Sequence, residues 1–404
     1  MILFLLLVIT EVFTYVTINK HFRESSKMAY YISVTINSVL SIFMWMVYYR
    51  VVSFNGYYDD PGHVWMMMIL NGALAAILFP RVLLNICHFS GLLIRILKGG
   101  HIRQLTNAGF ILSAVIFTII IYGSTIGKLN FRTEEVNIKI NNLKPDLEGL
   151  TIVQMSDLHM AGFYKHKSEF RKILERVKSY KPDILINSGD FVSYGWREFE
   201  RNDTVLSILK GKYGNFAVMG NHDIGTYNPQ WNAEQRDSNL YRMNLLVKAA
   251  GYTILTDRDT IIKIGKTEVA VIGVITGGRH PHMIHGDLEK AKVGSDSADL
   301  RILISHDPNH WEESVRGKTN IELTLSGHTH GMQMGILTKH VKWSPSVYFY
   351  PRWGGLYNSG DQYLYVNRGL GVLEIPFRLW MPPEVTIIRL TSGQKKELVI
   401  KENG

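Results

Sequence analysis

Five short stretches between residues 157 and 330 place side chains that can bind metals or transfer protons beside small residues. They read SDLH, SGD, GNHD, SHD and GHTH. The candidate residues are Asp157, His159, Asp190, Asn221, His222, Asp223, His306, His328 and His330. Carboxylate, amide and imidazole donors without thiolates suit Mn²⁺, Fe or Zn²⁺ better than an all-oxygen Ca²⁺ site. One such stretch alone is an ordinary loop, but five in order indicate a metal site.

Each of these stretches follows a run that is rich in β-formers. The runs are 150–156, 183–190, 215–221, 300–307 and 321–328. Polar residues at the carboxyl ends of strands meet at one edge of an α/β sheet. Active sites commonly lie in the crevice at that edge. The two-residue spacing of Asp157/His159 and of His328/His330 predicts that each pair points to one side of extended backbone. Gly327 and Gly331 are expected to let the last loop turn tightly beside a ligand.

The remainder of residues 128–404 alternates between short strands and helices. Further strands are expected at 135–140, 260–264, 267–274, 363–369 and 384–390. Apolar spacing predicts helices at 167–180 and 239–250. This pattern predicts an α/β domain in which sheet layers are flanked by helices.

Residues 1–127 have a different character, because they consist mostly of apolar runs. Residues 1–18, 28–49, 64–94 and 106–126 are each long enough for a membrane helix, which needs about 20 apolar residues. Pro80 predicts a kink in the third run, or a tilted and partly interfacial helix. Glu11 is costly in the first run unless it is paired, which leaves open a functional role or simple pairing. About four membrane helices in 1–127 are therefore expected to precede a catalytic domain in 128–404.

Basic residues in the loops predict how these helices are oriented. They follow the first run at Lys20, Arg23 and Lys27, and the third run at Arg95, Lys98 and Arg103. Positive loops stay cytoplasmic, so the N-terminus and everything after Ile126 are expected outside the cytoplasm. The protein is thus predicted to be a multi-pass protein of the cell membrane with an extracytoplasmic catalytic domain. The orientation reverses if the third run forms two spans.

Composition excludes several other classes of protein. The chain has 404 residues, a net charge of +9 and one cysteine, Cys87, which rules out an intrachain disulfide and a four-cysteine zinc site. The positive charge is dispersed, and no basic helix or aromatic-basic module is apparent, so nucleic acid is not an expected partner. The expected partners are the lipid bilayer and a phosphorylated substrate.

The ordered series Asp-x-His, Gly-Asp, Gly-Asn-His-Asp, His and Gly-His-x-His resembles the calcineurin-like metallophosphoesterases, including multi-span bacterial members. The resemblance covers roughly residues 148–390 and implies a two-sheet β-sandwich flanked by helices, with two divalent metal ions at one edge. It implies that one ion is bound by Asp157, His159, Asp190 and His330. It implies that the other is bound by Asn221, His306, His328 and a bridging Asp190. By the same resemblance, His222 is the catalytic acid and Asp223 its orienting partner.

This site predicts hydrolysis of phosphate monoesters, diesters or pyrophosphates. Two metals about 4 Å apart can activate water and stabilise the phosphoryl oxygens during in-line displacement. A lipid-linked substrate is the first hypothesis, because membrane tethering raises its local concentration. One alternative is an enzyme like UDP-diacylglucosamine pyrophosphohydrolase, whose substrate is cytoplasmic. Another is a non-catalytic membrane receptor for phosphorylated ligands, which a missing ligand residue would signal, and none is missing.

Several features depart from the family pattern or lie beside it. Ser193 stands where relatives commonly have a second acid, and Met332 replaces the second glycine of Gly-Gly-Gln. His280, His282 and His285 share one loop that could extend the metal site, bind phosphate or be solvated. The aromatic stretch 342–357 and the apolar stretch 375–384 could pack internally, lie at the membrane interface or form an apolar wall for a lipid.

Overall fold

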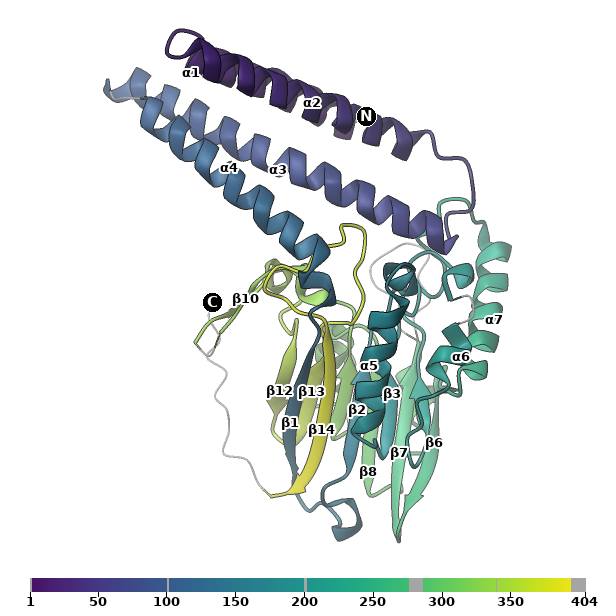
Figure 1. Cartoon of the computed structure of the whole chain (residues 1–404). Coiled ribbons are helices and arrows are strands. Elements are labelled where there is room, and N and C mark those ends of the chain that lie inside the picture. Colours follow the sequence, from purple (N-terminus) through teal and green to yellow (C-terminus); the bar gives the residue numbers. More distant parts are fainter. Residues whose placement is uncertain (1, 100–101, 200–201, 276–285, 339, 394–404) are drawn as a thin grey trace. The chain divides into compact units, whose positions relative to one another are not determined.

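The computed structural model describes residues 2–99, 102–199, 202–275, 286–338 and 340–393 (Figure 1). Contacts divide the chain into two compact units, called here the helical unit and the catalytic unit. The helical unit comprises Met1–Gly56, Met66–Gly127 and Glu374–Leu379. The catalytic unit comprises Tyr57–Trp65, Lys128–Leu373 and Trp380–Gly404. Each unit therefore includes a short segment from the other part of the sequence.

Four helices, all long and apolar enough to cross a membrane, dominate the N-terminal part. They are α1 (Ile2–Phe22), α2 (Lys27–Val52), α3 (Pro61–Lys98) and α4 (Ile102–Thr125). The expectation of four apolar helices is confirmed. Helix α3 continues through Pro80, so the third apolar run forms one helix rather than two.

Two inserted segments are fixed by contacts within their own units. In the helical unit, the Arg378 backbone amide donates to the Gly123 carbonyl at 3.2 Å. In the catalytic unit, Arg197 forms an ion pair with buried Asp59, with Nη1 and Oδ1 separated by 2.9 Å. Part of the apolar stretch 375–384 thus packs with the helices.

The catalytic unit contains two six-stranded sheets, and the predicted two-sheet fold is confirmed. The first sheet, in spatial order, is β1 (Arg132–Ile140), β14 (Glu384–Ser392), β2 (Thr151–Met155), β3 (Ile184–Asn187), β4 (Asn215–Ala217) and β5 (Thr253–Ile254). The second is β12 (Gly355–Ser359), β13 (Gln362–Val366), β9 (Leu323–Ser326), β8 (Leu300–Ser305), β7 (Thr267–Val274) and β6 (Arg258–Ile264). A small hairpin pairs β10 (Ile336–Leu337) with β11 (Lys342–Trp343).

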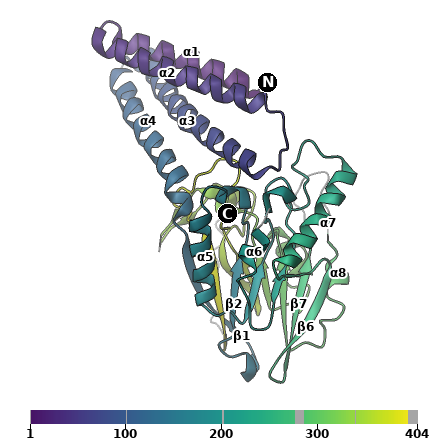
Figure 2. The same ribbon diagram turned by 45° about the vertical axis from the view of Figure 1, so that its right-hand side comes forward.

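The two sheets pack face to face, and helices cover their outer faces (Figures 1 and 2). Ile152 and Ile186 of the first sheet meet Ile302 and Leu325 of the second in a dry core. The neighbouring strand residues point the other way, toward α5 (Lys167–Ser179), α6 (Asn202–Leu206) and α7 (Ala233–Ala249). The second sheet is covered by α8 (Leu288–Ala291) and a turn at Trp311–Val315. This alternation follows from the two-residue period of strands.

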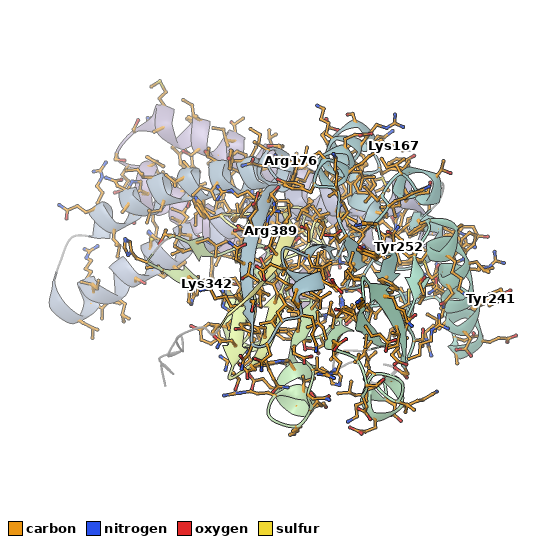
Figure 3. The ribbon with its side chains drawn as sticks, turned by 90° about the horizontal axis from the view of Figure 1, so that it is seen from below. Lys167, Arg176, Tyr241, Tyr252, Lys342 and Arg389 are labelled. Atoms are coloured by element: carbon orange, nitrogen blue, oxygen red, sulfur yellow. The ribbon has the colours of Figure 1, made fainter. Side chains whose placement is uncertain are left out.

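The two longer covering helices follow their apolar spacing. Helix α5 buries Phe170, Ile173, Leu174 and Val177, the residues that predicted it. Helix α7 buries Met243 and Val247 but exposes Tyr241, which lies at the periphery (Figure 3). It begins six residues before the predicted start, at a capping box formed by Asn232 and Gln235.

Strand direction brings the chemistry-bearing turns together. Strands β2, β3, β4 and β5 run parallel, as do β7, β8, β9 and β13. In each sheet the carboxyl ends of these strands therefore open at one edge. The polar stretches follow β2, β3, β4, β8 and β9 at those ends.

Candidate metal centre

The backbone leaves the strands in strained turns at the candidate ligands. Five of them have positive φ: Asp157 (50°), His159 (40°), Asp190 (57°), His328 (73°) and His330 (49°). This region is costly for residues with a side chain, and such strain concentrates at functional sites. The prediction that the two-residue pairs lie on extended backbone is wrong, because β2 ends at Met155 and β9 at Ser326. The turns, rather than the strand period, direct these side chains.

One cluster of donor atoms brings Asp157 and His159 to His330. Their ligand atoms all lie within 4.8 Å of one another, and the three side chains are buried. His159 Nε2 lies 3.1 Å from His330 Nε2, which lies 3.3 Å from Asp157 Oδ1. Residues 171 positions apart in the sequence thus meet in one site.

A second cluster consists of Asp190, His306 and His328. His306 Nε2 lies 3.0 Å from Asp190 Oδ2 and 3.3 Å from His328 Nδ1. Asn221 Oδ1 lies 2.8 Å from the same His328 nitrogen, so the amide oxygen joins this cluster. His328 and His330 therefore belong to different clusters, although only Thr329 separates them.

The protonation pattern of the imidazoles fits a cation in each cluster. His306 Nδ1 donates to the Ser188 carbonyl at 2.7 Å, so in the neutral ring Nε2 carries a lone pair. That lone pair faces His328 Nδ1, and His159 Nε2 similarly faces His330 Nε2. Burial lowers the pKa of His159 and His328, which favours the neutral form that binds metals. Nitrogen and oxygen donors in this arrangement fit Mn²⁺, Fe or Zn²⁺.

The buried carboxylates also favour positive charge. Burial opposes ionisation of Asp190, but His306 and His222 outweigh it and lower its pKa. Burial alone would lower the pKa of His306, yet Asp190 raises it to about 10. A divalent cation competes with this proton for the same position, so metal binding is expected to release it.

Glycines allow the loops to approach these carboxylates. A Cβ on Gly327 would lie 2.4 Å from Asp157 Oδ2, and one on Gly220 would lie 2.2 Å from Asp190 Oδ1. Gly327 therefore has the expected role of close approach. Gly331 has a positive φ of 53°, and a Cβ there would meet Met381 Sδ at 2.8 Å rather than a ligand. Gly369, which follows β13, packs against Asp157 and was not anticipated.

The structure gives His222 and Asp223 separate tasks. His222 Nδ1 donates to the Ser193 carbonyl at 2.7 Å, and its ring stacks on Tyr227 at 4.2 Å. The Asp223 carboxylate accepts backbone hydrogen bonds from Asp190, Phe191, Val192 and Gly220. Asp223 was expected to orient His222, but these bonds fix the loop that carries Asp190.

Two further residues support the ligands and were not predicted to do so. Ser193 Oγ lies 3.1 Å from His159 Nδ1, so the residue that departs from the family pattern still contacts a candidate ligand. Tyr350 Oη lies 2.7 Å from His328 Nε2. The aromatic stretch 342–357 thus packs partly against the site, and its density of tyrosines was the available signal. His280, His282 and His285 lie outside the described residues.

The two-sheet fold and the paired donor clusters are the features expected of a metallophosphoesterase domain. Residues 150–332 match the model of the calcineurin-like phosphoesterase family, so this part of the chain is a calcineurin-like phosphoesterase domain. The matched range includes all nine candidate site residues. The protein therefore has a metallophosphoesterase domain preceded by four apolar helices.

Curated relatives share this domain at modest identity. The uncharacterized metallophosphoesterase YkuE of Bacillus subtilis (strain 168) is 26% identical over 271 residues, which are 64% of this chain and 85% of the relative. The uncharacterized metallophosphoesterase Cj0846 of Campylobacter jejuni is 27% identical over 289 residues, covering 71% of this chain and 70% of the relative. A "transmembrane protein with metallophosphoesterase domain" of Danio rerio is 27% identical over 298 residues, which are 72% of this chain and 63% of the relative. Together with the four apolar helices, the last relative indicates membrane association.

Proposed function

We propose that this protein hydrolyses a phosphate ester or pyrophosphate at two divalent ions, and that its substrate is linked to a lipid. The observation that carries the hydrolytic proposal is the pair of adjoining clusters in which buried imidazole nitrogens face one another and a carboxylate. The residues that would hold the ions are Asp157, His159, Asp190, Asn221, His306, His328 and His330, and Asp190 would be shared between the two ions.

The chain's own residues supply proton transfer and positioning. When bound, the two ions supply positive charge for the phosphoryl oxygens and lower the pKa of water. Because His222 Nδ1 donates to the Ser193 carbonyl, Nε2 is the nitrogen that takes up the second proton, and the doubly protonated ring can give that proton to the leaving oxygen. The stack on Tyr227 holds that ring in place. Asp223 keeps Asp190 aligned through the loop backbone.

The lipid-linked part of the proposal rests on the helices. Four membrane-length helices hold the enzyme at a bilayer, where a lipid substrate is concentrated in two dimensions. The aromatic stretch 342–357 supports it as well, since Tyr348 is 76% exposed on the same stretch as Tyr350, which contacts His328. An exposed tyrosine there suits an amphipathic substrate.

The proposed orientation is extracytoplasmic. Because α3 is one helix, four spans return the chain to the side of its N-terminus, and the basic loops after α1 and α3 stay cytoplasmic. Protease added to intact cells should cut the catalytic unit. Protection of that unit would reverse the orientation and favour a cytoplasmic nucleotide-linked lipid as substrate.

The activity test uses the full-length protein in detergent, stripped with a chelator and reloaded with Mn²⁺, Fe²⁺ or Zn²⁺. We expect metal-dependent hydrolysis of bis(p-nitrophenyl) phosphate and metal-dependent phosphate release from a membrane-lipid extract. Hydrolysis of the soluble diester without phosphate release from lipid would support the phosphoesterase activity and refute the lipid-linked substrate. Metal binding without turnover of any phosphoester would instead indicate a receptor.

A further inference from the structure

The helical unit contains a cavity that the proposed hydrolysis does not use. It has a volume of about 820 Å³ and lies where α1 and α3 end and α4 begins. The start of α2 lies at this same end of the helical unit (Figure 1). Its lining is polar, unlike the apolar lengths of the helices that form it.

Cations from three helices converge on this cavity. Lys20 of α1, Arg95 of α3 and Arg103 of α4 line it, and Glu24 is the only carboxylate among the lining residues. None of the ion pairs found among the described residues involves Lys20, Arg95 or Arg103. The cavity is therefore a concave site with a net positive charge that the described carboxylates do not neutralise.

A buried histidine at the cavity offers a further polar atom. His88 is 4% exposed, and its Nδ1 is paired with Thr106 Oγ1 at 3.1 Å. Its Nε2 is buried and has no hydrogen-bond partner within the described part of the chain. Thr106 also lines the cavity. A buried polar group without a partner is costly, so a ligand that pairs with Nε2 would relieve that cost.

The surroundings of the cavity indicate where its ligand comes from. Leu93, Ile96 and Leu97 on the last turns of α3 are 57%, 72% and 70% exposed. Exposed apolar residues next to the three cations are typical of the boundary between the acyl chains and the headgroups of a bilayer. Basic pockets between transmembrane helices on the cytoplasmic side bind anionic headgroups.

We propose that this cavity binds the phosphate group of an anionic phospholipid from the surrounding leaflet. Arg95 and Arg103 hold the phosphate oxygens by charge-assisted hydrogen bonds, and Lys20 adds charge from α1. His88 also lines the cavity, and its Nε2 would gain a partner in the same headgroup. The bound lipid ties α1, α3 and α4 together, and this role is independent of phosphoester hydrolysis.

Loop cations also orient membrane proteins, and that role alone requires no cavity. The chain offers a matched control in Arg23 and Lys27, which belong to the same α1–α2 region but do not line the cavity. Removing either pair changes the net charge by the same amount. Only the cavity pair should affect a bound lipid.

The test places full-length protein in phosphatidylcholine nanodiscs with a minor fraction of phosphatidylglycerol. The lipid retained after transfer to detergent is then counted by native mass spectrometry. We expect retained phosphatidylglycerol in the wild type and a loss of about tenfold or more in affinity for Arg95→Gln/Arg103→Gln. Arg23→Gln/Lys27→Gln should retain the lipid. Equal loss in both double variants, or no preference over phosphatidylcholine, would refute the proposal.

Two further arms separate the remaining outcomes. Inorganic phosphate that displaces the lipid and raises the melting temperature as much as the lipid does would assign the cavity to a free phosphate anion. An unchanged helical circular dichroism spectrum and an unchanged elution volume in detergent check that the cavity variant is folded. If that variant misfolds, Lys20→Gln removes one cation and should still lower retention.

Discussion

The two units of this protein use buried polar side chains for different purposes. In the helical unit, Asn85 of α3 donates to the Thr10 carbonyl and to Thr14 Oγ1, and accepts from Thr17, all on α1. In the catalytic unit, buried imidazole nitrogens face each other at 3.1 and 3.3 Å. The contacts of Asn85 join two helices, whereas the facing nitrogens of the catalytic unit belong to donor sets that could hold a cation.

Two ionisable residues of the helical unit, whose burial in a membrane costs free energy, have hydrogen-bond partners on neighbouring helices. Arg81 Nη2 donates to the Asn37 carbonyl and to Ser41 Oγ, each at 3.0 Å, which links α3 to α2. Glu11 Oε2 accepts from Trp45 Nε1 at 2.6 Å. Glu11 is therefore paired, which was one of the two interpretations that the sequence left open. Its contact joins α1 to α2.

The largest effect is expected from Asp190→Ala. Losing the proposed bridging carboxylate should remove metal from both clusters and lower turnover on the order of 10³-fold or more. Metal content by elemental analysis and hydrolysis of bis(p-nitrophenyl) phosphate measure the two effects. Asp237→Asn, at an exposed position on α7, is the control. Normal turnover in Asp190→Ala would refute the metal assignment.

His222→Ala should lower turnover without lowering metal content. General acid catalysis contributes about 10²- to 10⁴-fold, and its loss matters most for a poor leaving group. We expect a large defect on an alkyl phosphate ester and a smaller one on a p-nitrophenyl ester. The exposed His340→Ala serves as the control. Equal defects on both esters would mean that His222 is not the acid.

Ser193→Ala should have a smaller effect, which acts through His159. Without the contact to His159 Nδ1, that ring loses its orientation, and metal affinity should fall about 10-fold. Ser193→Asp should restore the affinity, because a carboxylate also accepts from Nδ1. Ser207→Ala, which removes a half-buried hydroxyl that donates to the Thr204 carbonyl, is the control. The readout is the metal concentration at half-maximal turnover, and an unchanged value would exclude this positioning role.

Asn85→Leu should leave the chemistry intact and weaken the helical unit. Interhelical hydrogen bonds in membranes average about 0.6 kcal/mol each, so losing three should cost about 2 kcal/mol. A lower melting temperature in detergent with unchanged metal content is the expected result. Thr118→Val removes a bond within its own helix and is the control. Loss of metal in Asn85→Leu would contradict the division of roles between the two units.

Local patterns in the sequence predicted the elements. The apolar spacing of Phe170 to Val177 predicted α5, and the run 267–274 coincides with β7. Strand β5 and the hairpin of β10 and β11 were missed, because two-residue strands have no periodicity to detect. The early start of α7 was missed because the capping box at Asn232 was not considered.

The sequence alone determined the types of donor, their order and the helices that precede them, because these depend on composition and short-range spacing. The family resemblance implied how the donors divide between two ions, but no local pattern of residues gives that division, and the tertiary structure brings the donors of each cluster together. His328 and His330 reach different clusters because both lie in left-handed backbone, which directs their side chains away from the pattern of a strand. Ser193 and Tyr350 reach the ligands His159 and His328, and Asp223 fixes the loop of Asp190 rather than His222, through contacts that no local pattern encodes.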